Sequence, residues 1–178
     1  MDFTQPLVLP TTVELSTGQM VTIRLILPGD APLLVEMFGQ LSARTRRLRY
    51  HAFTAELPLD QAILMSNLDP ARQAALVATC RNDEGEHILG VTQLARASAG
   101  TVEAEMAIVV RDDFQGMGLG THLFNLLLAV AYSMGIQRVF GWVKSENRSM
   151  LQLFRKTNLP ICIEHCSGEM LVEVAFDA

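Results

Sequence analysis

The chain has 178 residues and a mass of 19.6 kDa, the size of one ordinary domain. An apolar share of 49% and a charged share of 19% exclude a disordered chain, because this balance permits a large buried core. The net charge is -5, yet residues 114–156 hold one acid, Glu146, against five basic residues: Arg138, Lys144, Arg148, Arg155 and Lys156. This segment favours an anionic ligand, although a buried helix and strand would also avoid acids.

Membrane insertion, export and metal binding are not expected. The longest apolar stretch, Leu123 to Ile136, contains polar residues and is shorter than the roughly 20 residues that cross a bilayer. The N-terminus lacks the pattern of an export signal. Cysteines at 80, 162 and 166 fit free thiols in a reducing cytoplasm, the location that we expect. Cys162, His165 and Cys166 would be the zinc ligands, but no second ligand pair accompanies them, so we expect no metal.

The first 70 residues predict a hairpin followed by three helices. Val13 to Leu15 and Met20 to Leu27 flank a Ser-Thr-Gly turn. Asp30 is the expected N-cap of a helix that runs to about Leu41. Ser42 is the expected start of a second helix, whose arginines we interpret as a solvated face, with a substrate contact as the alternative: Arg44, Arg46, Arg47 and Arg49. Leu59 to Leu68 is the third helix.

From position 73 the pattern predicts mainly strands. Two-residue alternation indicates a meander over residues 73–80, 88–96 and 102–110. A strongly helical segment then runs from Gly118 to Met134. The end of the chain predicts a strand, a short helix and a strand pair at 138–143, 147–156, 161–165 and 169–176. No repeat or linker is found, so we expect one α/β domain over 1–178, with 1–12 as an N-terminal extension.

The densest chemical signal lies between a strand that ends at Val110 and a helix that starts near Gly118. It reads Gln115-Gly116-Met117-Gly118-Leu119-Gly120-Thr121. Glycines let the backbone approach an anion closely, and the free amides of a helix start point toward it, so a pyrophosphate fits. Walker A and Rossmann loops do not match, because Lys-Ser/Thr after Gly120, a glycine at 121 and a later acid are missing.

The spacing Gln-x-x-Gly-x-Gly, here Gln115, Gly118 and Gly120, resembles that of the GNAT superfamily of N-acetyltransferases, whose loop binds the pyrophosphate of acetyl-CoA. The resemblance extends from about Met20 to Phe176. Within the superfamily, the chain is most similar to the acetyltransferase domain of bacterial protein-lysine acetyltransferases. This resemblance implies one GNAT-like α/β domain with a central mixed, mostly antiparallel sheet of six to seven strands. Helices should flank this sheet, which should splay apart at the acetyl-CoA site.

The resemblance also implies cofactor-binding residues. The backbone of Ile108, Val109 and Val110 should bind the pantetheine arm as an added strand would, and a free amide there could hold an oxyanion. The loop from Gln115 to Thr121 should bind the pyrophosphate. Asn147 should contact the arm, with plain N-capping as the alternative. Phe154 stands where a tyrosine commonly protonates the leaving thiolate, so Phe154 is expected to pack on the cofactor instead.

Acetylation of an amine requires a base, because a lysine with a pKa of about 10.4 is less than about 0.1% neutral at pH 7. Glu103 and Glu105 share one face of the strand that ends at Val110. Glu105 is close to where the resemblance places a glutamate that acts directly or through water. Glu105 is therefore the first candidate base and Glu103 the second, with an exposed acidic strand face as the alternative interpretation.

We expect an acetyl-CoA-dependent N-acetyltransferase that transfers the acetyl group directly to a primary amine, on a protein lysine or a small molecule. A non-catalytic acyl-CoA-binding or regulatory module is the alternative, because Phe154 cannot donate a proton. A nucleotide-dependent enzyme that uses the loop for ATP or NAD is a further one. Nucleic acid and membrane are not expected as partners, and a homodimer is left open.

Overall fold

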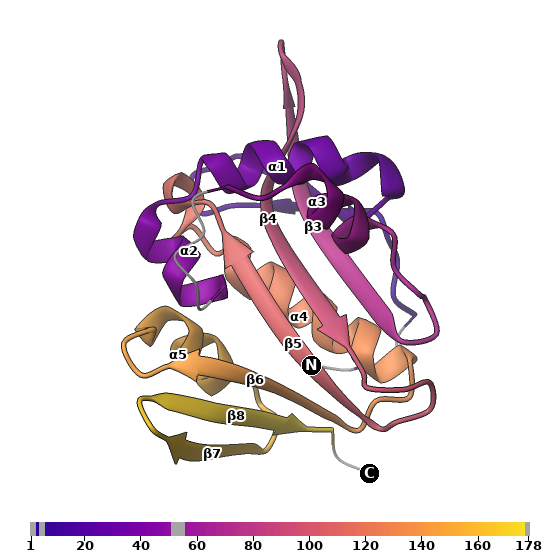
Figure 1. Cartoon of the computed structure of the whole chain (residues 1–178), viewed down its shortest axis with the longest axis vertical. Coiled ribbons are helices and arrows are strands. Elements are labelled where there is room, and N and C mark those ends of the chain that lie inside the picture. The colour runs from indigo at the N-terminus through magenta and orange to yellow at the C-terminus, as the bar shows by residue number, and fades with distance from the viewer. Residues whose placement is uncertain (1–2, 4–5, 51–55, 177–178) are drawn as a thin grey trace.

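A computed structural model describes the chain except for residues 1–2, 4–5, 51–55 and 177–178, so part of the expected extension 1–12 lies outside the described residues. One sheet forms the centre of the molecule (Figure 1). Its eight strands are β1 (Thr11–Glu14), β2 (Met20–Leu25), β3 (Gln73–Asn82), β4 (Gly85–Ala95), β5 (Glu103–Val110), β6 (Arg138–Lys144), β7 (Ile161–Cys166) and β8 (Glu169–Ala175).

The strands lie in the order β1-β2-β3-β4-β5-β6-β8-β7. Every neighbouring pair is antiparallel except β5 and β6, which are parallel. The expected mixed, mostly antiparallel sheet is thus confirmed. It has eight strands rather than six to seven, because the short edge strand β1 and the closing strand β7 both pair with their neighbours along their length.

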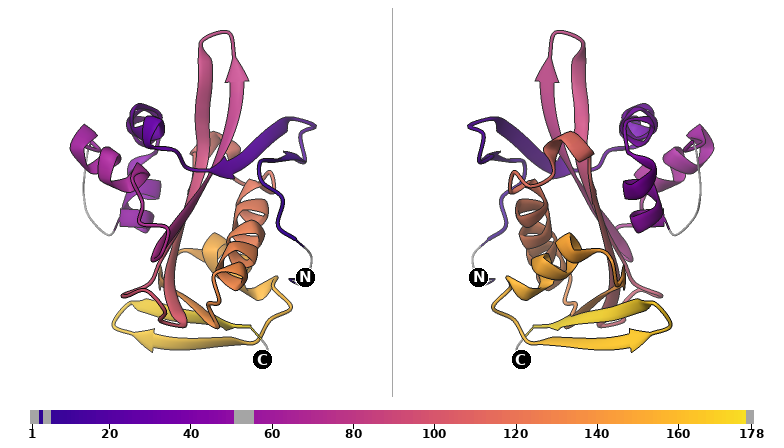
Figure 2. Two further views of the ribbon diagram at one scale, coloured as in Figure 1. Left: turned by 90° about the vertical axis from the view of Figure 1, so that its right-hand side faces the viewer. Right: turned by 90° about the vertical axis from the view of Figure 1, so that its left-hand side faces the viewer.

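Helices cover both faces of the sheet (Figure 2). On one face lie α1 (Ala31–Gly39), α2 (Ala43–Tyr50) and α3 (Leu59–Ser66), and on the other lie α4 (Leu119–Ser133) and α5 (Arg148–Arg155). Two short 3-10 turns, η1 (Pro28–Asp30) and η2 (Asp112–Phe114), precede α1 and the glycine loop. The described helices include none that is long and apolar enough to cross a membrane.

Helix α4 packs closely on the middle of the sheet because its apolar side chains recur at helical spacing. Leu119, Leu123 and Leu127 are fully buried. Gly90 on β4 permits the close contact, since a Cβ at this position would lie 3.0 Å from Leu123 Cδ1 and 3.1 Å from the Val109 carbonyl oxygen. This packing fixes the start of α4, and with it the glycine loop, against the end of β5.

The N-terminal helices begin differently from one another. Asp30 occupies the expected N-cap position of α1, but its side chain makes no capping hydrogen bond, because Arg24 binds both of its oxygens at 2.7 and 2.9 Å and the Leu27 amide donates to it at 2.8 Å. At α2 the expected cap is present, since Ser42 Oγ accepts a hydrogen bond from the Thr45 amide at 3.2 Å.

The sheet divides between β5 and β6. The parallel pairing joins Glu103, Ala104 and Glu105 to Arg138, Val139 and Phe140, and it stops there. Beyond this point β5 remains paired with β4 as far as Val110, whereas β6 remains paired with β8. Figure 1 shows β5 and β6 diverging toward α2 and α5. The expected splay of the sheet is therefore present, and its two edges leave backbone groups of both strands exposed to a ligand.

Candidate functional site

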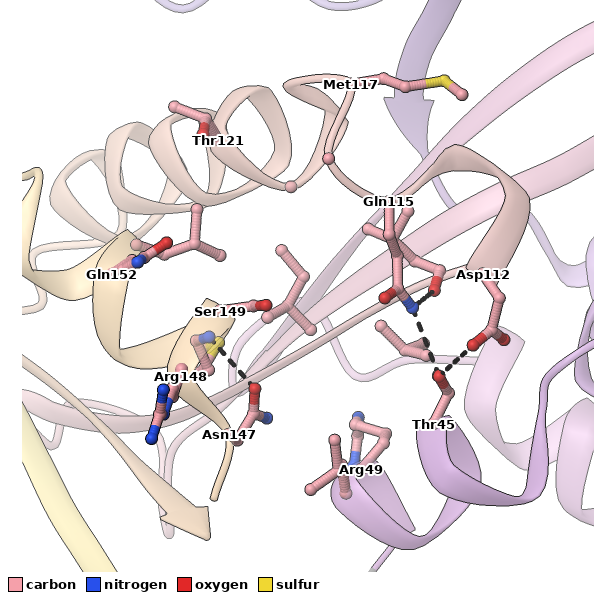
Figure 3. A pocket seen from close by; sticks show the side chains of 18 of the residues that line it. Thr45, Arg49, Asp112, Gln115, Met117, Thr121, Asn147, Arg148, Ser149 and Gln152 are labelled. Atoms are coloured by element: carbon pink, nitrogen blue, oxygen red, sulfur yellow. Dashed lines mark hydrogen bonds between the residues drawn. The ribbon is translucent and has the colours of Figure 1, made fainter. Parts of the chain in front are cut away.

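A cavity of about 790 Å³ lies beside the diverging strands (Figure 3). Its walls come from α2, the end of β5, the glycine loop, the start of α4 and helix α5. A volume of this size is within the range of about 300 to 1,000 Å³ that small-molecule and cofactor sites occupy. The cavity therefore has room for a ligand of cofactor size.

The glycine loop forms one end of this cavity. Gly116 and Gly118 have φ angles of 76° and 93°, which glycine adopts without strain, and no heavy atom lies within 4 Å of where their Cβ atoms would be. Among the described residues, the amides from Gly116 to Gly120 donate to no protein acceptor. A run of free amides at the N-terminus of α4 is a binding site for an anion.

Gln115 connects the loop to its surroundings through its side chain. Its Nε2 atom donates to the Val110 carbonyl at 2.9 Å and to Thr45 Oγ1 at 3.3 Å. The side-chain amide thus holds the end of β5 and the start of α2 together. The expected contribution of Gln115 to anion binding would therefore be indirect, through the shape of the loop.

Asp112 fixes the start of α2 against the same loop. Its carboxylate accepts from the Ser42 amide at 2.8 Å, from Ser42 Oγ at 2.7 Å and from Thr45 Oγ1 at 2.7 Å. Partial burial alone would raise the pKa of Asp112, but these hydrogen bonds outweigh it and the pKa is lowered. The ionised carboxylate is therefore the form that holds α2.

Asn147 lies at the opposite wall, at the start of α5. Its Oδ1 atom accepts a hydrogen bond from the Met150 amide at 3.1 Å, so the residue is an N-cap. Its side chain also lines the cavity, and its Nδ2 atom makes no hydrogen bond within the described part of the chain. The two expected roles are compatible, because capping uses the oxygen and leaves the amide nitrogen for a ligand.

Two of the expected cofactor contacts lie away from the cavity. Phe154 is fully buried, with its ring centroid 5.2 Å from that of Phe124, and Leu153 occupies the cavity wall instead. Leu119 is also fully buried, because its side chain packs under α4. Leu119 can therefore reach a ligand only through its backbone amide, and Phe154 contributes to the core rather than to the wall.

A second, smaller cavity of about 90 Å³ adjoins the first and lies between the diverging strands, nearer to their last paired residues. Glu105 lines it together with Trp142 of β6, whose side chain is 42% exposed. Glu103 lies at the far end of the three-residue pairing and forms an ion pair with Arg138. The two candidate bases are thus separated, and Glu105 is the one beside a cavity.

Helix α2 lines the large cavity with four residues, Arg44, Thr45, Leu48 and Arg49, of which the sequence analysis did not single out Thr45 and Leu48. Leu48 and Arg49 also line the small cavity. The expected solvated arginine face is therefore wrong for Arg49, which is half-buried with its Nε atom shielded from solvent. The spacing of these residues puts them on one helical face. Leu48, the single leucine in this arginine-rich helix, was the signal that this face turns toward the protein and is half-buried.

An ion pair joins the two walls of the large cavity. Arg47 Nη2 of α2 lies 2.9 Å from Glu146 Oε1, in the turn before α5. Both side chains are half exposed, so this contact contributes at most about 1 kcal/mol. The ion pair nevertheless connects α2 to the turn before α5 across the space between the diverging strands.

The residues considered for a metal do not converge. Cys162 and Cys166 are both exposed and alternate with His165 along β7, so His165 points to the other face of the sheet. The described residues contain no group of three or more His, Cys, Asp or Glu side chains that could hold a metal ion.

Comparison with known protein families identifies the family of the chain. A sequence model of the acetyltransferase (GNAT) family matches residues 42–158. This span begins at the cap of α2 and ends beyond α5, so it contains both walls of the large cavity and the candidate base.

Two curated proteins are similar to the chain. Acetyltransferase Pat of Mycolicibacterium smegmatis is 26% identical over 169 residues, covering 93% of this chain and 48% of Pat. Acetyltransferase PA5475 of Pseudomonas aeruginosa is 28% identical over 143 residues, covering 79% of this chain and 75% of that protein. The chain therefore spans about half the length of Pat and three quarters of the length of PA5475.

Solved structures share the fold. The GNAT domain of S. lividans PAT has a TM-score of 0.84 and 25% identity, covering 93% of this chain and 96% of that domain. A cAMP-binding acyltransferase from Mycobacterium smegmatis has a TM-score of 0.65 and 24% identity, covering 97% of this chain and 48% of that protein. The similarity again corresponds to about half of the longer protein.

Proposed function

Because this chain belongs to the acetyltransferase (GNAT) family, we propose that it transfers an acetyl group from acetyl-CoA directly to a primary amine. The observation that carries the proposal is the run of free amides from Gly116 to Gly120 at one end of a cofactor-sized cavity. These amides would hold the pyrophosphate, and the parted edge of β5 from Ile108 to Val110 would bind the pantetheine arm. Acetyl-CoA supplies an activated thioester when it is bound.

Glu105 is the proposed proton acceptor. Glu105 lines the small cavity, and the C-terminal end of the same strand, from Ile108 to Val110, lines the large one. An amine that enters from the small cavity would therefore meet Glu105 before it reaches the end of the pantetheine arm. The carboxylate would take the proton of the amine directly or through a water molecule.

The open face of the sheet beside Glu105 favours a cationic acceptor. Cross-strand pairing puts Phe140 opposite both Glu105 and Glu173, and Trp142 opposite Leu171, on one face. The same face carries Glu103, Glu164 and Glu169, so glutamates outnumber the cations Arg138 and Lys144 there. Aromatic and acidic side chains together suit the alkyl stem and ammonium group of a lysine.

We therefore favour a protein lysine as the acceptor. The two curated relatives are named acetyltransferases, and one solved relative is the GNAT domain of a PAT protein. Since the chain matches about half of Pat, this support concerns the acetyltransferase part of such proteins.

Calorimetric titration with acetyl-CoA, ATP and NAD tests the donor half of the proposal. We expect binding of acetyl-CoA alone, and preferential binding of ATP or NAD would contradict the proposal. Thiol release in the presence of lysine peptides, polyamines and amino acids then tests the acceptor. Binding of acetyl-CoA without release for any amine would favour the non-catalytic acyl-CoA-binding module.

A further inference from the structure

Among the described residues, no tyrosine hydroxyl lies where it could protonate the leaving thiolate. Phe154 has none and is buried in the core. The chain has two tyrosines. Tyr50 packs on Phe38 with ring centroids 5.0 Å apart, and Tyr132 packs on Phe3 and Phe176. Neither tyrosine lines a cavity. A thiolate that forms in the site needs a different partner.

Arg49 lies where the two cavities meet. Five residues line both of them, and Arg49 is the one that carries a charge; the others are Leu48, Ile108, Asn147 and Met150. Figure 3 shows Arg49 with Asn147 and Thr45 at one end of the large cavity, away from Thr121 and the start of α4. This is the end where the reactive part of a ligand anchored at the glycine loop would lie.

The Arg49 side chain is half-buried, and its guanidinium carbon lies 4.9 Å from the centroid of the Tyr50 ring, but no carboxylate is paired with it among the described residues. Its Nη2 atom donates to Gln93 Oε1, a neutral amide, at 2.9 Å. Within the described residues, its Nε atom has no acceptor and the side chain forms no ion pair. Burial lowers the pKa of Arg49, while Tyr50 and, to a smaller extent, the charge of Glu105 act in the opposite direction. A cation with a shielded, unpaired donor is costly unless an anion binds beside it.

We propose that Arg49 stabilises the thiolate of CoA as it leaves, in the role that a tyrosine acid has elsewhere. The inference rests on the proposed function. Glu105 takes the proton of the amine as the bond between nitrogen and the acetyl carbon forms. Arg49 meanwhile donates a hydrogen bond to the sulfur, which keeps the electron pair of the broken carbon–sulfur bond. Arg49 keeps its own proton, because guanidinium stays protonated in proteins.

Titration of the thiol of bound CoA tests this role without any turnover, since the thiolate is detected by its ultraviolet absorbance. An adjacent cation should lower the thiol pKa of bound CoA by about one unit or more relative to free CoA. The shift should be lost in Arg49→Met and Arg49→Gln and partly kept in Arg49→Lys. Arg49→Gln retains a polar group toward Gln93, so it serves if the methionine variant does not fold.

Arg47→Met is the matched control, because it removes a cation from the same helix at an exposed position that lines neither cavity. We expect it to keep the thiol pKa of the parent. Equal thiol pKa values in the parent and in a folded, CoA-binding Arg49→Gln would overturn the inference. A parent that does not bind CoA would overturn both proposals, whereas a shifted thiol without acetylation of any amine would overturn the proposed function alone.

The choice of acetyl donor gives a second readout. A thiol with a low pKa leaves as a thiolate with little stabilisation, so Arg49→Gln should reduce the rate of acetyl transfer least for thioesters of such thiols. Donors with more basic thiols should be slowed most. A loss that is the same for all donors would indicate that Arg49 only shapes the cavity, and would contradict the assigned role.

Discussion

The two ends of the cavity system are built from different parts of the chain. At the glycine loop, the polar groups are backbone amides from five consecutive residues, 116 to 120, and they depend on φ angles that glycine permits. At the junction with the small cavity, the polar groups are side chains from three separate elements: Arg49 of α2, Glu105 of β5 and Asn147 before α5. The first end is local in sequence, and the second exists only after folding.

This difference has a functional meaning. Backbone amides recognise an anion whatever side chains surround them, so the loop end can bind the same donor in many related proteins. Side chains brought together by tertiary contacts can change independently, so the junction end can be adapted to different acceptors. The predictions below test whether the two ends act separately.

The largest effect is expected at the junction end. Glu105→Gln should lower the rate of acetyl transfer at neutral pH by about a hundredfold to ten-thousandfold, the usual contribution of a general base. Affinity for acetyl-CoA should stay close to that of the parent, because Glu105 lines only the small cavity and not the large one. Glu103→Gln is the comparison variant, and a larger loss there would assign the base to Glu103.

At the loop end, Gly118→Asp should weaken acetyl-CoA binding on the order of a hundredfold, since a side chain at φ 93° costs about 1 to 2 kcal/mol and its charge repels the pyrophosphate. Gly135→Asp is a matched control, with φ 73°, open space and a place at the other end of α4. Calorimetry on the folded variants should show a loss in Gly118→Asp alone, and equal losses would contradict the assignment.

Asp112 connects the two ends, so Asp112→Asn should destabilise the docked position of α2 by about 1 kcal/mol, the usual net value of a hydrogen bond, because it weakens the acceptor for Ser42 and Thr45. The lowered pKa of Asp112 means that its contribution is complete above about pH 4 and is lost as the pH falls through the folded-state pKa. Hydrogen exchange of the α2 amides should therefore accelerate at acid pH in the parent. A similar acceleration in Asp112→Asn would show that another group is responsible.

The smallest effect on activity is expected for Phe154→Tyr. The hydroxyl would enter a fully buried position beside Phe124, which costs about 1 to 3 kcal/mol of stability if it stays unpaired. The rate of transfer per folded molecule should change little, because the ring does not reach the cavity. Tyr50→Phe should likewise retain most activity. A strong gain in Phe154→Tyr would show that the ring turns toward the cofactor.

Sequence reasoning was strongest where the structure is local. Strand alternation and the glycine spacing predicted the order of the elements and the loop before α4, because both depend on neighbouring residues. Sequence reasoning interpreted Arg49 as part of a solvated arginine face, with a substrate contact as the alternative, and expected Phe154 to pack on the cofactor. Both positions depend on which side of a short helix faces the sheet, and the hydrogen bond of Arg49 is made to Gln93, 44 residues away in the sequence.

The short parallel contact between β5 and β6 has a further consequence for the cohesion of the molecule. Two antiparallel blocks, β1 to β5 and β6 to β8, share three paired positions, and packing of α4 and α5 supplies most of the remaining connection. A donor whose pantetheine arm binds along the unpaired edges of β5 and β6 would supply hydrogen bonds that the two strands do not make with each other. The bound donor would then help to hold the two blocks together. Without it, the contact between β5 and β6 would be the first part of the sheet to separate.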